Sequence, residues 1–296
     1  MLKIESQAIR RRIQPSPFTL QLAHFTGRKR AFLGANFSPS LGVMFSPPSR
    51  LAAALLVLAL APAAVLHAEP AILAKARAYL GPEAALNAVK SVHYSGTMAT
   101  PNPADPAKPA LTAIDIIFQA PYRQRTVRTT DSLVDTTALD TYDGWHRVQD
   151  PKNPGQWRMQ LLPTDQIKLQ RAIVLENLAF YRGMEREGCQ VLDQGSTTVG
   201  GVPCRKIAFI HAANITFFRY FDEASGRLIL TETEGGSTIR EQGEIMAGGI
   251  RFPRVIVNST TTADGREQTI TITFDTITVN EKFPDSTFAI PSFTAK

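Results

Sequence analysis

Two different periods of apolar residues follow one another along this chain. In residues 70–91 the apolar residues recur at helical spacing, and Gly81-Pro82 interrupts them. Gly stops helices and Pro begins them, so this stretch predicts a helix, a break and a second, short helix. From residue 91 onward apolar and polar residues mostly alternate, which is typical of β-strands with one buried face.

One further helix interrupts the predicted strands. Pro163, Thr164 and Asp165 form a start signal, and Gly183 provides a stop. Between these signals apolar residues recur at helical offsets. They are Ile167, Val174, Leu175 and Leu178. We therefore expect a helix at about residues 164–180.

Short strands separated by turns such as EASG, GGS and ADG fill the rest of the chain. They predict one antiparallel meander of about ten or eleven strands, a mainly β (α+β) fold. In the last strand the apolar positions change from even numbers, up to Phe274, to odd numbers from Ile277. Such a change requires a bulge or bend near Asp275, as curved sheets and barrels have.

The stretch TALDTYDGWHRVQDP, residues 137–151, gathers several acid–base side chains. Asp143-Gly144 predicts a two-residue hairpin turn. Trp145 and His146 then point to opposite faces of a strand, and we expect Trp145 to face the core and His146 to face water. His93 is expected at the rim of the sheet. These two and His211 accompany no catalytic or metal-binding motif, so a hydrolase is the least favoured class and no cofactor or metal is expected.

The N-terminal part of the chain predicts export. The apolar run 51–66 is too short and proline-broken for a membrane span, but its basic flank and the small residue Ala68 are typical of a secretory signal peptide at 44–68. The prefix 1–43 is then a start-site artefact or a disordered segment, or else a genuine basic arm. We expect a single domain at 69–296, periplasmic, with no lipid anchor and no transmembrane segment.

The basic balance of the chain comes from this N-terminal part. The whole sequence has 32 Lys and Arg against 26 Asp and Glu, but residues 1–68 hold eight of the basic residues and one acid. Residues 69–296 are therefore close to neutral. A nucleic-acid partner is not expected, because such proteins carry a basic patch.

Cys189 and Cys204 are the only cysteines. In an exported protein two thiols favour a disulfide. The segment between them reads as strand, Gly-rich turn and strand, and this hairpin would place the two cysteines side by side.

Several segments together resemble the outer-membrane lipoprotein-sorting (LolA/LolB-like) family. They are FQAPYRQR, YDGWHRVQDP, LPTDQIKLQ, GSTTVGGVPCRKI and YFDEASGRLI, which follow the N-terminal helix in the family's order over most of residues 70–290. The resemblance implies a half-open antiparallel barrel whose concave face is covered by helices and encloses an apolar cavity for acyl chains. The family's carriers have an arginine directly before the proline of the first segment, where this chain has Ala120, so the arginine's gating role does not carry over.

The hypothesis from the sequence is an exported, non-enzymatic half-barrel that binds a hydrophobic ligand, a lipid or a lipoprotein acyl chain. The alternative is an envelope sensor or scaffold that contacts a protein partner through the same fold. Apolar side chains on the strands and on the inserted helix are the candidates for lining a cavity, although core packing is their usual role. They are Phe118, Trp145, Trp157, Leu175, Leu178, Phe217, Ile272 and Phe274.

Overall fold

The computed structural model describes residues 69–102, 104–105, 107–262 and 264–291. The expected signal peptide at 44–68 and the prefix 1–43 lie outside these residues. Among the described residues no helix is both long and apolar enough to cross a membrane.

The helices lie where the apolar periods predict them. The N-terminal pair is α1 (Ala71–Leu80) and α2 (Glu83–Ala88), separated at Gly81-Pro82. The inserted helix is α3 (Thr164–Leu178), and short 3-10 turns follow at Met184–Glu187 and Asp285–Thr287.

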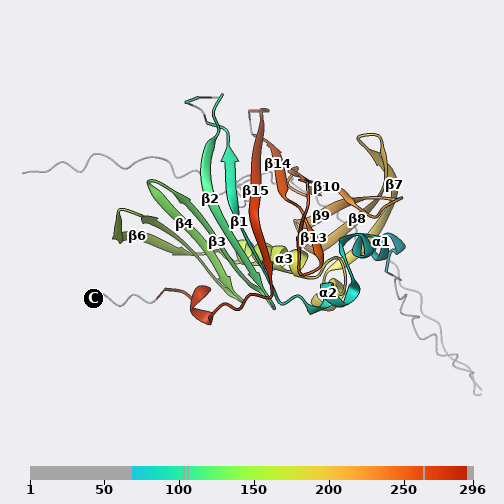
Figure 1. The fold of residues 1–296 in the computed structure, drawn as a ribbon, viewed down its shortest axis with the longest axis horizontal. Helices are drawn as coiled ribbons and strands as arrows, with labels where there is room; N and C mark the ends of the chain where they lie inside the picture. Colours follow the sequence, from blue (N-terminus) through green and yellow to red (C-terminus); the bar gives the residue numbers. More distant parts are fainter. Residues whose placement is uncertain (1–68, 103, 106, 263, 292–296) are drawn as a thin grey trace, which may run out of the picture. The chain divides into compact units, whose positions relative to one another are not determined.

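The described strands form one open antiparallel sheet of thirteen strands and a separate two-stranded hairpin. The large sheet has the order β6-β5-β4-β3-β2-β1-β15-β14-β11-β10-β9-β8-β7, so β6 and β7 are its edges (Figure 1). The strands are β1 (Ser91–Thr100), β2 (Ala110–Gln119), β3 (Arg123–Thr130), β4 (Leu133–Asp140), β5 (Asp143–Asp150), β6 (Asn153–Leu161), β7 (Gln190–Val199), β8 (Val202–Ala212), β9 (Ile215–Asp222), β10 (Leu228–Thr233), β11 (Thr238–Gln242), β12 (Ile245–Ala247), β13 (Ile250–Phe252), β14 (Val255–Thr261) and β15 (Glu267–Val279).

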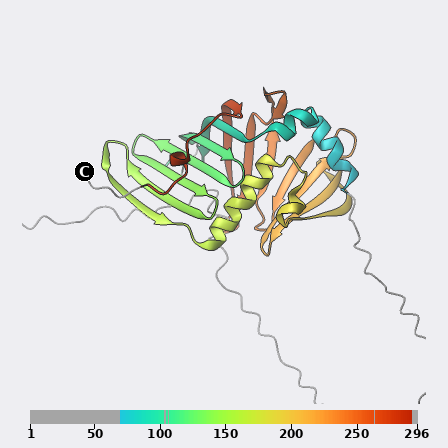
Figure 2. The same ribbon diagram turned by 90° about the horizontal axis from the view of Figure 1, so that it is seen from below.

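This architecture confirms the predicted fold class, a mainly β half-barrel with an N-terminal helix and an inserted helix. Helix α3 crosses one face of the sheet, which we call the inner face (Figure 2). The opposite face is the outer face. The strand count exceeds the expected number partly because β6 was not recognised and partly because breaks at Gly243 and Pro253 separate the short strands β12 and β13 from β11 and β14.

The predicted irregularity near Asp275 is also confirmed. Strand β1 pairs with β15 through Ser95–Thr276 and then Gly96–Phe274, so Asp275 is an extra residue on β15. Such a bulge bends a sheet locally. Gly96 is required there, because a Cβ atom at this position would lie 2.1 Å from the carbonyl oxygen of Thr273.

The hairpin between β4 and β5 differs from the expectation. Asp140 pairs with Asp143, so the two turn residues are Thr141 and Tyr142, and Thr141 has a positive φ of 59°. Gly144 is a strand residue instead. A Cβ atom on Gly144 would lie 2.8 Å from Cδ1 of Leu162, just before α3, so the Leu162 side chain packs closely over this glycine.

The predicted disulfide is wrong: Cys189 and Cys204 are both free and buried. The turn between β7 and β8 lies at Gly200-Gly201. Cys204 pairs with Thr197, eight residues after Cys189, which directly precedes β7. At about 3.3 Å per residue, the two cysteines lie roughly 20 Å apart along the hairpin. The turn does not lie midway between the two cysteines but close to Cys204. Their separation is far beyond the reach of a disulfide.

Candidate ligand-binding cavity

An apolar chamber with a volume of about 200 Å³ lies between α3 and the inner face of the sheet. Its apolar walls come from strands on both sides of β1 and from the end of α3. They include Tyr94, Ile116, Phe118, Phe217, Ile239, Ile256, Ile270, Ile272 and Phe274 on the strands, and Ile173, Phe180 and Tyr181 at α3 and just beyond it.

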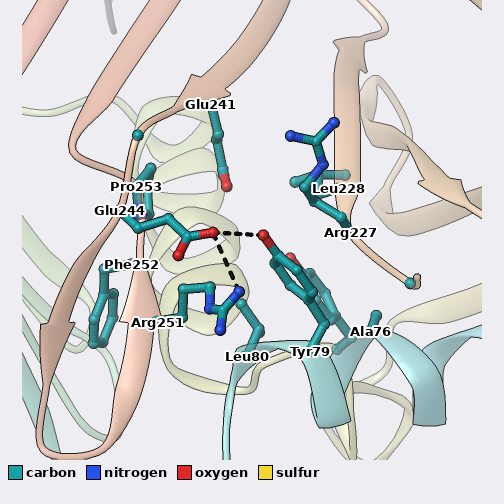
Figure 3. A pocket seen from close by; sticks show the side chains of 13 residues that line it. Ala76, Tyr79, Leu80, Arg227, Leu228, Glu241, Glu244, Arg251, Phe252 and Pro253 are labelled. Atoms are coloured by element: carbon teal, nitrogen blue, oxygen red, sulfur yellow. Dashed lines mark hydrogen bonds and ion pairs between the residues drawn. The ribbon is translucent and has the colours of Figure 1, made fainter.

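A more polar pocket of about 340 Å³, which we call the vestibule, lies beside the chamber. The vestibule lies between α1, the turn after β9, and the β11–β13 segment (Figure 3). Both spaces are lined by Leu80, Tyr181, Glu241, Arg251, Phe252 and Pro253. We call this shared boundary the junction.

A buried charge cluster closes the chamber on the side of α3. Glu176 of α3 lies 2.6 Å from His211 Nε2 on β8 and 2.6 Å from Arg219 Nη2 on β9. Only 3% of the Glu176 side chain and 11% of the Arg219 side chain are exposed. The Arg219 guanidinium also stacks over Tyr181 and Phe209, at 4.8 and 5.2 Å from the ring centres. The cluster thus ties α3 to two strands of the sheet.

A second buried arginine anchors the end of α3. Arg77 of α1 is 1% exposed and donates hydrogen bonds to the carbonyl oxygens of Ala179 and Phe180, at 3.2 and 2.7 Å. A cation at this place stabilises the C-terminus of a helix. Its charge is paired with Glu83, 2.7 Å away, and the pKa of Glu83 is lowered by this hydrogen bond.

Four of the candidate residues line the chamber, namely Phe118, Phe217, Ile272 and Phe274. Leu175 and Leu178, both on α3, pack against the hydrophobic core but do not line the chamber. Trp157 lies on the edge strand β6 and is 37% exposed. Ala120 lies in the β2–β3 turn, where its N–H donates to Lys90 O.

Trp145 lies outside the chamber. Paired residues on neighbouring strands share a face of the sheet. Tyr94 lines the chamber, and successive cross-strand pairs connect it to His146, namely Tyr94–Ile116, Ile116–Thr126, Thr126–Thr137 and Thr137–His146. His146 is therefore on the inner face, and its neighbour Trp145 is on the outer face. There it is 3% exposed, because the C-terminal segment covers it, and its Nε1–H donates to Phe288 O at 2.9 Å. Trp145 is thus buried as expected, but on the opposite face, and the orientations expected for Trp145 and His146 are reversed.

Each of the three histidines in the described residues pairs with a carboxylate. His93 contacts Asp115 and Glu281 on the outer face, and His146 lies 3.1 Å from Asp135 on the inner face. Burial lowers the pKa of His93, but its two carboxylate partners outweigh burial, and the net pKa is raised. No potential nucleophile makes a hydrogen bond with His93 or His146 among the described residues.

His211 comes closest to a catalytic arrangement, because Cys189 Sγ lies 3.9 Å from its Nε2. A nucleophile–base–carboxylate triad uses both ring nitrogens of the histidine. Here Glu176 and Cys189 approach the same nitrogen. Burial also raises the pKa of the Cys189 thiol to about 12, so no thiolate forms near neutral pH. Neither Cys189 nor His211 lines the chamber.

The polar residues of the cavity were not among the candidates from the sequence. Glu176, Asn177, Arg219, Glu241 and Asn258 line the chamber beside its apolar walls. The sequence carried a signal for one of them, since Arg219 has the same parity as Phe217 and Phe221 and must share their buried face.

Fold and cavity together define a class: an open antiparallel half-barrel whose inner face and covering helix enclose an apolar chamber. No family model matches the chain, and no curated protein is detectably similar in sequence.

Solved structures of the lipoprotein-sorting type are among those similar to this chain. One is a putative outer membrane lipoprotein-sorting protein domain from Vibrio parahaemolyticus, with 10% identity, 73% of this chain and 95% of that chain covered, and a TM-score of 0.47. Another is a LolA superfamily protein from Nitrosomonas europaea, with 13% identity, coverages of 74% and 96%, and a TM-score of 0.47. A DUF1329 family protein from Desulfovibrio piger matches with 8% identity, coverages of 74% and 96%, and the same TM-score of 0.47. At these values function must be argued from the cavity itself.

Proposed function

We propose that this protein binds the apolar chain of a lipid or acyl-bearing ligand in the chamber beneath α3 and performs no chemistry on it. The observation that carries this proposal is the open chamber itself. Protein interiors are normally packed as densely as organic crystals, so an apolar space of this size is not ordinary core. Ligand pockets have this form, with mostly apolar walls and a few polar groups.

Binding would be driven by the transfer of apolar surface out of water. Each Å² of apolar surface removed from water contributes about 25 cal/mol, and an acyl chain would add dispersion contacts with the walls. The aromatic walls at Tyr94, Phe118 and Phe217 offer such contacts. The polar residues around them would orient the ligand.

Helix α3 would control access to the chamber. It covers the inner face, and its link to β8 and β9 is the ion-pair cluster at Glu176. Movement of α3 would separate these charges. The cluster would therefore favour the closed state until the binding of a ligand offsets the free-energy cost of separating them.

Export completes the proposal. The signal-like segment at 44–68 would direct the chain to the periplasm and be removed after Ala68, leaving the single domain 69–296. N-terminal sequencing of the protein from a periplasmic fraction tests this, and an uncleaved N-terminus would contradict it.

The experiment for ligand binding is native mass spectrometry of the purified protein, followed by titration with a fluorescent fatty acid. We expect co-purified lipid and saturable uptake. Ile256→Trp, which would fill the chamber, should abolish uptake, whereas Ile229→Trp on the outer face is the matched control. Absence of both bound lipid and uptake in the unmodified protein would contradict the proposal.

A protein-binding scaffold is the second candidate, favoured by the edge strand β6. There Trp157 and Leu161 are 37% and 63% exposed on the outer face. Exposed apolar side chains on a sheet edge are typical of sites where a partner strand adds. Replacing Leu161 by Lys should abolish such a complex in a pull-down from envelope extracts without changing lipid uptake.

A further inference from the structure

Two arginines on the outer face of the sheet have no partner in the described part of the chain. Arg125 of β3 and Arg147 of β5 are both half-buried, yet neither makes a hydrogen bond or an ion pair with a described residue. Every other arginine in this part of the chain that is not exposed donates to a carboxylate or to a carbonyl oxygen. These include Arg123 and Arg128, the other arginines of β3.

The register of the sheet brings the two side chains towards one another. Arg125, Ala138 and Trp145 pair across β3, β4 and β5, so they form one row on the outer face. Arg147 lies two residues beyond Trp145 on β5 and therefore shares this face. Its guanidinium carbon is 5.8 Å from the centre of the Trp145 ring. The Arg147 side chain thus turns along its strand towards the row that contains Arg125.

Strand β4 runs between the two arginines and supplies no counter-charge. At the positions between them it carries Thr136 and Ala138, each 1% exposed. Asp140, the next residue of β4 on this face, is held by another arginine at 2.9 Å. The carboxylate of Asp115 on β2 is held by a histidine at 2.6 Å. The acidic groups around the two arginines are therefore engaged with other side chains.

The unpaired charges are unfavourable for the protein. Burial lowers the pKa of Arg125; Asp115 opposes this effect, and the charge of Arg147 adds to it. The Nε of Arg147 is buried without a hydrogen-bond partner, but no other nitrogen of the two guanidinium groups is both buried and unpartnered. The remaining nitrogens are open to solvent and can donate to a ligand. An anion held between the two side chains would supply the missing counter-charge.

We infer that Arg125 and Arg147 form an oxyanion site on the outer face, and that its ligand carries a phosphate group, as phosphate esters and phospholipid head groups do. Guanidinium groups bind phosphate through charge-assisted hydrogen bonds. A phosphate has oxygens in three directions and can meet two guanidinium groups from different strands, whereas a carboxylate has two oxygens in one plane. The chamber lies on the inner face, so this site is separate from it and does not depend on the binding of a chain there.

The first test measures the melting temperature of the purified protein in glycerol 3-phosphate at constant ionic strength, with glycerate as the carboxylate of similar size. Glycerol 3-phosphate should raise the melting temperature by about 2–4 °C at roughly five times its dissociation constant. Glycerate should bind about tenfold more weakly, or not at all. Tryptophan fluorescence should change over the same range of glycerol 3-phosphate concentration, because Arg147 lies over Trp145.

Three variants separate the site from the general charge of the surface. Arg125→Met and Arg147→Met each remove one guanidinium group and keep an apolar stem. Each should raise the dissociation constant about tenfold, the effect of one charge-assisted contact, and the double variant should lose the shift. Arg158→Met is the matched control: this exposed arginine of β6 pairs with Val148 and so lies on the inner face. It should leave the shift unchanged. Uptake of the fluorescent fatty acid should be the same in every variant.

A second test, sedimentation with phosphatidylglycerol vesicles, distinguishes the source of the phosphate. A response to glycerol 3-phosphate that the double variant loses supports a soluble ester. Vesicle binding that the double variant loses, without that response, supports a lipid head group. The inference is overturned if the unmodified protein responds to neither, if glycerate binds as tightly as glycerol 3-phosphate, or if the double variant behaves like Arg158→Met.

Discussion

Glu176 on α3 and Arg219 on β9 lie 2.6 Å apart in the wall of the chamber, with His211 2.6 Å from the other oxygen of the same carboxylate. One acidic side chain thus holds the covering helix against two strands. Buried charges cost several kcal/mol to desolvate, and this cost is offset only while the partners stay together.

Removal of the carboxylate should therefore destabilise the protein strongly. For Glu176→Gln we expect a loss of about 3–5 kcal/mol in the free energy of unfolding, because Arg219 is left buried without a counter-charge. Urea denaturation followed by tryptophan fluorescence measures it. The double variant Glu176→Leu/Arg219→Met should recover most of the loss. A single-variant loss below about 1 kcal/mol, the range of a surface ion pair, would contradict the buried arrangement.

Trp145 should matter for stability and not for ligand uptake. Trp145→Ala removes a buried ring and its hydrogen bond to Phe288 O, which should cost about 3–5 kcal/mol. Because Trp145 lies on the outer face, the folded fraction should still take up the fluorescent fatty acid with unchanged affinity. Phe118→Ala, which alters the wall of the chamber, is the comparison and should change uptake. An equal loss of affinity in both variants would contradict the assigned faces.

The class of fold could be predicted from the sequence because the apolar periods are local signals. The helices, the alternating strands and the bulge at Asp275 all follow from the spacing of neighbouring residues. The face of the sheet to which a given side chain points was harder to predict. Burial alone did not reveal that Trp145 packs under a C-terminal segment more than a hundred residues away in sequence.

The candidate site was predicted only in part for a similar reason. Phe118, Phe217, Ile272 and Phe274 have apolar partners at the same parity, and the strand period places them on the inner face. The failure of the disulfide has a different cause, since the Gly-rich segment allowed several turn positions and the choice of Gly200-Gly201 shifts the register of the hairpin. Glu241 is polar and lies near a strand end, so nothing in its neighbourhood indicated a cavity.

The ion pairs of His93 predict a dependence of stability on pH. Its pKa in the folded protein is raised above the ordinary value of 6.5, since Asp115 and Glu281 outweigh the effect of burial. The charged form is therefore stabilised by folding, so the contribution is fully present below pH 6.5 and is lost as the pH rises through the folded pKa. The free energy of unfolding measured from pH 5.5 to 8.5 should fall more steeply in the unmodified protein than in His93→Gln. Parallel curves would show that His93 has no raised pKa.

The close approach beside α3 gives a last test, on Gly144. In Gly144→Ala the new Cβ atom would lie 2.8 Å from Leu162 Cδ1 and 3.2 Å from both Leu162 Cβ and Ile167 Cγ1, so the side chains of Leu162 and Ile167 must shift. Overpacking of this kind costs about 1–3 kcal/mol. Gly155→Ala on the edge strand is the matched control, since its Cβ atom would meet only Asn153 Oδ1 at 3.7 Å. Thermal unfolding of both variants compares them. We expect Gly144→Ala to lower the melting temperature by several degrees and Gly155→Ala to leave it nearly unchanged. Equal melting temperatures would contradict the tight packing of Leu162 and Ile167 against Gly144.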